Sequence, residues 1–278
     1  MTEILSIEHL NVGLKKEPTR LLVKDSSFKL SAGKTTCIVG ESGSGKSLTA
    51  LTIMGLLSNQ LVASGHVFFN GVDLTTLDNK AMRTIRGAQI GMIFQEPMTS
   101  LNPVLTVGFQ IGEVLTAHKG LKGDALKSKI ATLLTQVGIP EERANSYPDE
   151  LSGGQRQRVM VAMSIACEPA LLIADEPTTA LDVTVQAQIL TLLDELKNRM
   201  KMAMLFITHD FGVVSDIADD VIVMFKGEIV EAGPKKQVLE NPQHPYTKAL
   251  LDCVPDVEGK KVLKPIDYAW LKTNEVSA

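Results

Sequence analysis

Apolar and polar residues alternate along two stretches near the N-terminus, residues 4–12 and 21–30. Alternation with a period of two places the apolar side chains on one face of a β-strand. The segment Lys15-Lys16-Glu17-Pro18 between the two stretches is charged and contains a proline, which is typical of a solvated turn. The pattern therefore predicts an antiparallel pair of strands at the start of the chain.

Short apolar runs recur further along the chain and predict buried strands. They cover residues 35–39, 64–71, 90–94, 171–174, 202–208 and 221–225. Helical patterns occupy residues 48–57, 106–118, 124–137, 156–166 and 183–200. Because strand and helix patterns alternate, we expect an α/β fold with a mostly parallel sheet.

The balance of strand and helix patterns divides the chain into regions. Strand patterns vanish after residue 95, so we interpret residues 96–168 as a helical insertion in an α/β domain that covers residues 1–240. Residues 241–278 contain several prolines and predict a C-terminal extension with a short helix and a loose tail.

Composition narrows the possible functions. Of the 278 residues, 44% are hydrophobic, which is ample for a packed core, and a formal net charge of −4 gives no basic footprint for nucleic acid. Cys37, Cys167 and Cys253 lie too far apart in sequence to suggest a metal site or a disulfide framework, so we expect reduced thiols. The first residues do not resemble a signal peptide, and no apolar run approaches the ~20 residues of a membrane helix. We therefore expect membrane association only through partner chains.

One glycine-rich loop carries the strongest chemical prediction. It has the pattern G-x-x-x-x-G-K-S and consists of Gly40, Glu41, Ser42, Gly43, Ser44, Gly45, Lys46 and Ser47. Between a strand and a helix, such a loop turns its N–H groups toward phosphates, and the helix N-terminus adds partial positive charge. Lys46 is expected to reach the β- and γ-phosphates of a nucleotide, and the Ser47 hydroxyl to bind Mg²⁺.

Two carboxylates follow the predicted strand at residues 171–174. A strand end beside a phosphate loop is where a Mg²⁺-binding carboxylate belongs, and Asp175 fits that role. Glu176 is placed to polarise an attacking water. The alternative is an ordinary acidic turn before Pro177.

A second anion site is predicted at Leu151-Ser152-Gly153-Gly154-Gln155. Ser152 suits the N-cap of the following helix, and the two glycines leave N–H groups uncovered. The alternative is a plain capped helix. One nucleotide would need both phosphate sites if two chains faced each other with ATP between them.

In order and spacing, these motifs resemble those of the ATP-binding subunits of ABC transporters. The resemblance covers residues 4 to about 252 and includes Gln95, the segment Ala180-Leu181-Asp182, and His209. It implies a P-loop NTPase core of the ABC type with an antiparallel β subdomain and a helical insertion. It further implies that Gln95 links nucleotide and Mg²⁺ to the membrane-facing helices, that Asp182 lies at the dimer interface, and that His209 contacts the γ-phosphate. Without the resemblance, His209 would be taken for a strand-end residue with its hydrogen bonds satisfied.

A narrower resemblance points to importers of dipeptides and oligopeptides. Residues 94–103, 175–188 and 241–247 are similar to that subgroup, and nickel importers share much of the pattern. It implies a peripheral protein on the cytoplasmic face of the membrane. The implied partners are a second ATP-binding subunit, homologous or identical, two membrane permease subunits and an extracytoplasmic substrate-binding protein.

Two positions depart from the family pattern. Leu14 stands where the family usually has an aromatic residue that stacks on adenine. The C-terminal region offers only Cys253 where some relatives have a cysteine cluster, so we predict no iron–sulfur centre.

Several functions remain open at this stage. Nickel or another metal chelate could replace peptide as cargo. A non-transport ABC ATPase acting on DNA or ribosomes is disfavoured by the acidic balance and the single ATPase unit. A module that binds ATP without turnover is disfavoured by the presence of both Glu176 and His209.

Overall fold

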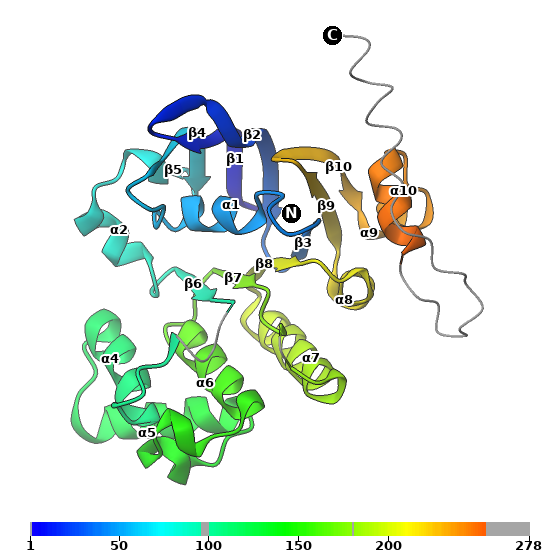
Figure 1. Cartoon of the computed structure of the whole chain (residues 1–278). Helices are drawn as coiled ribbons and strands as arrows, with labels where there is room; N and C mark the ends of the chain where they lie inside the picture. The colour runs from blue at the N-terminus through cyan, green and yellow to red at the C-terminus, as the bar shows by residue number, and fades with distance from the viewer. Residues whose placement is uncertain (1, 96–99, 180, 254–278) are drawn as a thin grey trace.

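Two β-sheets organise the chain in this computed structural model, which describes residues 2–95, 100–179 and 181–253 (Figure 1). The first sheet is antiparallel and has the strand order β2-β1-β4-β5. Its strands are β1 (Glu3–Leu14), β2 (Glu17–Ser31), β4 (Leu61–Phe69) and β5 (Val72–Asp73). The predicted N-terminal strand pair is therefore confirmed.

The second sheet has six strands in the order β10-β9-β3-β8-β7-β6. Its strands are β3 (Thr35–Val39), β6 (Ile90–Ile93), β7 (Leu171–Asp175), β8 (Ala203–Thr208), β9 (Asp220–Phe225) and β10 (Glu228–Pro234). All neighbouring pairs are parallel except β9 with β10, so the prediction of a mostly parallel sheet is confirmed.

Helices lie on both sides of the parallel sheet (Figure 1). The α-helices are α1 (Lys46–Ile53), α2 (Asn79–Ile85), α4 (Val107–Lys119), α5 (Gly123–Gln136), α6 (Gly153–Ile165), α7 (Val183–Met200), α8 (Phe211–Ile217), α9 (Lys235–Glu240) and α10 (Pro245–Asp252). The short 3₁₀ helices are η1 (Leu74–Thr76), η2 (Glu141–Asn145) and η3 (Pro148–Glu150). None of the helices within the described residues combines the length and apolar character needed to cross a membrane.

The sequence prediction did not include β5, α2 or α8, and two further differences have a clear local cause. Helix α1 ends at Ile53 rather than near residue 57, because Gly55 follows with φ 61°, a left-handed conformation that terminates helices. Strand β10 was not predicted. It is the edge strand of its sheet and is largely exposed, so polar residues interrupt its apolar pattern.

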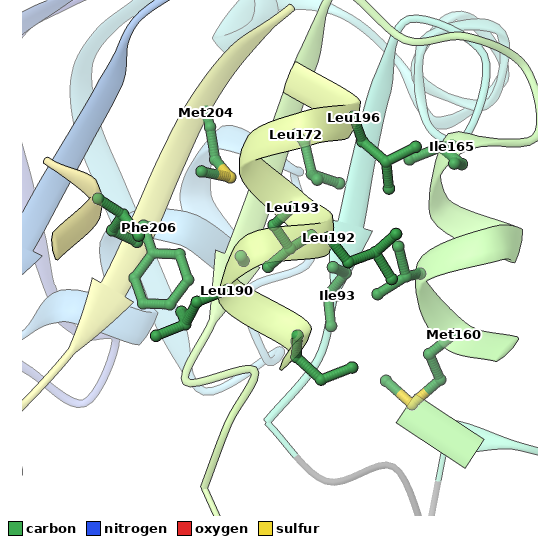
Figure 2. Close-up of a cluster of buried hydrophobic side chains, with 14 of the residues drawn as sticks. Ile93, Met160, Ile165, Leu172, Leu190, Leu192, Leu193, Leu196, Met204 and Phe206 are labelled. Carbon is green, nitrogen blue, oxygen red and sulfur yellow. The ribbon is translucent and has the colours of Figure 1, made fainter. Parts of the chain in front are cut away.

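The central strands separate two hydrophobic cores. In β3, Ile38 packs in the core under the antiparallel sheet, whereas Cys37 and Val39 pack in the core beneath the helices. Figure 2 shows the second core, where the leucines of α7 meet Leu172 of β7 and Phe206 of β8. Successive side chains of a central strand point to opposite faces of the sheet and so enter different cores. The parallel sheet therefore connects an upper lobe, which holds α1 and the antiparallel sheet, with a lower lobe that holds α4 to α7.

Candidate nucleotide-binding site

The glycine-rich loop runs from the end of β3 to the start of α1. A side chain at Gly40 would collide with the carbonyl oxygen of Met224 on β9, so only glycine fits there. Gly45 caps α1 with φ 104°, a conformation that glycine adopts without strain. The N–H of Ser44 donates to the Glu41 carbonyl over 3.2 Å, which closes the loop on itself. The sequence therefore fixes a tight turn at the N-terminus of a helix.

Lys46 is buried inside this loop, with 4% of its surface exposed. Its Nζ donates to the carbonyl oxygens of Gly40 at 2.7 Å and Glu41 at 2.9 Å. Burial lowers the pKa of Lys46, and the charges of Glu176, Asp175 and Glu41 act in the opposite direction. An ammonium group has three donors, so one remains for a phosphate oxygen.

Ser47 and Asp175 meet where α1 begins and β7 ends. The Ser47 hydroxyl donates to Asp175 Oδ1 over 3.0 Å. Burial raises the pKa of Asp175, and the Ser47 hydrogen bond and the Lys46 charge partly offset that rise. A hydroxyl beside a buried carboxylate is an oxygen donor set that suits Mg²⁺.

The protein side chains alone would not enclose such an ion. Within the described ranges, no cluster of three or more His, Cys, Asp or Glu residues could hold a metal. Mg²⁺ characteristically takes one or two carboxylates and completes its shell with water and substrate phosphates. The pair formed by Ser47 and Asp175 fits Mg²⁺ on those terms.

Glu176 is the centre of a hydrogen-bonded group at the ends of three parallel strands. Its Oε2 accepts from Gln95 Nε2 at 3.1 Å and from Thr179 Oγ1 at 3.0 Å, and lies 3.3 Å from His209 Nδ1. Glu176 has φ 45°, and its N–H donates to the Ile207 carbonyl at 2.9 Å. The carboxyl ends of parallel strands meet at one edge of a sheet, which brings residues 95, 176 and 209 together.

A cavity of about 450 Å³ opens between this group and the glycine-rich loop. It is lined by Gly40, Glu41, Ser42, Gln95, Glu176, His209, Phe211 and Leu250. The three catalytic candidates thus share one cavity with the start of the loop. Phe211 and Leu250 were not predicted as site residues, because the sequence does not distinguish an apolar helix residue that lines a site from one that packs in the core.

The second predicted anion site lies elsewhere. Ser152 caps α6, where its Oγ accepts from the Gln155 N–H at 3.3 Å and Gln155 Oε1 accepts from the Ser152 N–H at 3.0 Å. Gly153 has open space around it, whereas Gly154 lies against Val185 of α7. None of residues 152–155 lines the cavity, and Figure 1 draws α6 in the lower lobe, apart from α1. Within one chain, the two predicted phosphate-binding motifs are not brought together.

Asp182 and Leu14 also lie outside the cavity. Asp182 caps α7, and its Oδ1 accepts from the Val185 N–H at 2.9 Å. Leu14 is half-buried at the end of β1, where it pairs with Leu61 and Glu17. The neighbouring Ala180 falls outside the described residues.

The cysteines give no sign of redox or metal chemistry in the described part of the chain. Cys37 and Cys167 are buried, and Cys253 is half-buried; burial raises the pKa of the Cys37 and Cys167 thiols. That no iron–sulfur centre is bound stays a prediction, since residues 254–278 are not described.

A glycine-rich loop between a parallel strand and a helix, with a buried lysine and a hydroxyl–carboxylate pair, defines a P-loop nucleotide hydrolase. The model of the ABC transporter family matches residues 23–179, and the chain belongs to that family as an ATP-binding, ATP-hydrolysing member. A second model, the C-terminal region of oligopeptide/dipeptide transporters, matches residues 230–273.

Individual relatives agree with this assignment. A dipeptide transport ATP-binding protein of Bacillus subtilis is 49% identical over 274 residues, which cover 96% of this chain and 82% of that one. A glutathione import ATP-binding protein of Escherichia coli is 48% identical over 276 residues, or 96% of this chain and 44% of that one. Among solved structures, a dimeric ATP-binding cassette in a post-hydrolysis state with ADP and Pi has a TM-score of 0.74 at 27% identity, covering 84% of this chain and 99% of that one. The predicted fold class and family are therefore confirmed.

Proposed function

We propose that this chain is the ATP-hydrolysing subunit of a membrane importer of di- or oligopeptides. The hydrolytic part rests on one observation, the convergence of Gln95, Glu176 and His209 on a cavity beside the buried Lys46. The peptide part is supported by the relatives, which are named for dipeptide and glutathione transport, and by the match of the C-terminal region. The division into a domain of residues 1–240 and an extension of 241–278 belongs to the same proposal.

Each residue at the cavity has a distinct task in the proposed reaction. Lys46 neutralises charge on the β- and γ-phosphates, and the loop N–H groups orient them. Ser47 and Asp175, together with Gln95, would hold Mg²⁺, which would supply charge neutralisation at the phosphate oxygens. Glu176 accepts a proton from the attacking water, and His209 positions that water against the γ-phosphate.

Gln95 connects this chemistry to the lower lobe. It leaves the end of β6, and its amide donates to Glu176. Helix α4 of the lower lobe follows Gln95 in the sequence, so Gln95 is the residue through which a change at the γ-phosphate would reach that lobe. A hydrogen bond that forms or breaks with the charge on Glu176 is a direct route for such coupling.

Two chains are required for a complete site in this proposal. Ser152, Gly153 and Gly154 begin α6 away from the cavity, and the free space at Gly153 lets a phosphate approach the N–H groups from outside the chain. The similar cassette that was solved as a dimer with ADP and Pi supports this arrangement. The second chain is a homologous ATPase or another copy, and Asp182 lies in the interface between them.

A groove in the lower lobe suits the permease subunits. It has a volume of about 1020 Å³ and lies between α4, α5 and η2. Its lining includes Phe109, which is 52% exposed, and the charged residues Glu113, Lys127, Glu141 and Glu142, of which three are acidic. In this proposal the groove receives a permease segment with basic and apolar side chains, and the chain is peripheral on the cytoplasmic face of the membrane. An extracytoplasmic binding protein would deliver the cargo.

Reconstitution tests the proposed cargo. The full chain, co-expressed with its membrane partners and placed in proteoliposomes, should drive uptake of labelled dipeptides when Mg²⁺ and ATP are supplied. The matched control is the same complex with Glu176→Gln, which should bind ATP without sustained uptake. ATP-dependent uptake of nickel without uptake of peptides would contradict the peptide assignment while leaving the ATPase assignment intact.

A further inference from the structure

Tyr246 contacts the glycine-rich loop from a distant part of the sequence. It lies in α10, has no exposed surface, and its hydroxyl accepts a hydrogen bond from the Glu41 N–H at 3.1 Å. Its ring packs against Phe225 at the end of β9, with ring centroids 4.2 Å apart. A residue 205 positions further along the sequence than Glu41 therefore contacts the backbone of the loop.

Helix α10 is fixed in place independently of this contact. The Glu231 carboxylate on β10 accepts from the N–H groups of Gln243 at 2.7 Å and His244 at 3.0 Å. His244 then caps α10, where its Nδ1 accepts from the Tyr246 N–H at 3.1 Å. Figure 1 shows α10 beside β10 and α9. The Tyr246 hydroxyl thus approaches the loop from a helix whose start is tied to β10 by hydrogen bonds to Glu231.

We propose that Tyr246 is a positioning residue for the phosphate loop and, through it, for Lys46. The Glu41 N–H is held by Tyr246, and the Glu41 carbonyl is held by Lys46 Nζ at 2.9 Å. One residue of the loop thus links the tyrosine to the lysine through its own backbone. This inference rests on the proposed role of Lys46 in nucleotide binding.

The link to Lys46 is compatible with a bound nucleotide. Two donors of the Lys46 ammonium group hold the Gly40 and Glu41 carbonyls, and its third donor is the one available to a phosphate oxygen. The Tyr246 hydroxyl still holds the Glu41 N–H, since it approaches from the side of α10. Loop geometry is then kept by a residue outside the motif. Leu250, one turn further along α10, lines the same cavity and excludes water from that wall.

The test is Tyr246→Phe in the full chain, which removes the hydroxyl and keeps the ring on Phe225. A hydrogen bond is worth roughly a 2- to 10-fold change in an equilibrium constant, so the Kd and KM for ATP should rise by about that factor. The kcat at saturating ATP should stay within about twofold, because no reacting atom is touched. Tyr147→Phe is the matched control: that side chain is 45% exposed, and its variant should bind ATP as the wild type does.

The ATP affinities of Tyr246→Phe, Lys46→Ala and Tyr246→Leu separate the possible results. Unchanged ATP affinity in Tyr246→Phe, with or without a lower thermal midpoint, would overturn the inference and leave Tyr246 a packing residue. If Lys46→Ala also binds ATP normally, the phosphate-loop assignment itself fails. If Lys46→Ala loses ATP binding while Tyr246→Phe retains it fully, only the role of Tyr246 fails. Tyr246→Leu, which also removes the ring, should weaken ATP binding at least as much as Tyr246→Phe.

Discussion

Glu176 has an asymmetric environment, which matters for its chemistry. Within the described part of the chain, Gln95, Thr179 and His209 all contact the same oxygen, Oε2. The other oxygen, Oε1, is thereby left to accept a proton. The Glu176 side chain is 12% exposed and the His209 side chain is 60% exposed, so the histidine is the more accessible of the two.

Glu176→Gln keeps the shape of this side chain but removes its charge. An amide cannot take up the proton of an attacking water, so hydrolysis should fall by roughly 10²- to 10⁴-fold. ATP binding should persist, because Lys46 and the loop are unchanged. Steady-state phosphate release and equilibrium ATP binding check both statements. Turnover equal to the wild type would remove Glu176 from the role of base.

Asp175 should show a conflict between stability and function. Burial raises the pKa of its carboxyl, so the folded chain binds a proton more readily than the unfolded chain does. The free energy of unfolding therefore falls as pH rises from the unfolded pKa, about 3.9, through the folded pKa, and the ionised group destabilises the fold at neutral pH.

Asp175→Asn removes that charge and can still accept the Ser47 hydrogen bond. We expect it to raise the free energy of unfolding by about 0.5–2 kcal/mol at pH 7, with a smaller gain near pH 3. Mg²⁺-dependent hydrolysis should fall by about 10- to 100-fold. Denaturant melts at the two pH values measure the first effect. A destabilised variant at pH 7 would contradict the proposed effect of burial.

At the scale of elements, local sequence patterns account for most of the strands and helices. The apolar runs of β3, β7 and β8 are buried throughout, so their composition shows their position directly. The polar residues at the ends of such strands, including Asp175, Glu176 and His209, lie at the sheet edge for the same reason. Their roles in catalysis stay predictions.

What local patterns could not supply is contact between distant elements. Tyr246 was noted only as part of a subgroup motif, and its contact with Glu41 depends on how β10 and α9 carry α10 back to the loop. Strand β10 was not predicted for a similar reason, because an exposed edge strand lacks a continuous apolar pattern. Its neighbours, rather than its own sequence, determine its structure.

The junction of α6 and α7 permits a paired test. A methyl group at Gly154 would lie 2.7 Å from Val185 Cγ1, too close for two carbons. Gly154→Ala should therefore destabilise the protein by about 1–3 kcal/mol and reduce ATPase activity.

Adding Val185→Ala to that variant makes room and should restore most of the stability. The comparison needs thermal midpoints and ATPase rates of both single variants and the double variant. Restored stability without restored activity would show that the Gly154 backbone itself, rather than the packing of α6 on α7, is needed for function. If Val185→Ala gives no rescue of stability, the steric explanation is wrong.

For the whole molecule, the proposed composite site makes a prediction about mixtures. Ser152→Arg puts a bulky cation at the start of α6, which should block closure between two chains and hence hydrolysis. ATP binding at Lys46 should be nearly intact, because residues 152–155 do not line that cavity. Lys46→Ala should abolish ATP binding.

Mixing the two inactive variants within the assembled complex tests whether the site is shared. Mixed dimers of identical chains should regain one working site each, and activity should return in part. Absence of recovery, with mixed dimers shown to form, would identify a different ATPase as the partner. Normal hydrolysis by Ser152→Arg alone in the complex would instead contradict the composite site.

The side chains of β3, β7 and β8 alternate between two cores, which limits the mutations that these strands can tolerate. Because neighbouring residues on a strand face opposite lobes, deleting one codon moves each later side chain to the wrong core. The same deletion in β3 or β7 would also shift the loop or Glu176 along the sheet edge. These strands should therefore tolerate exchanges among apolar residues but almost no change of length, whereas surface turns such as Asn70-Gly71 should accept insertions.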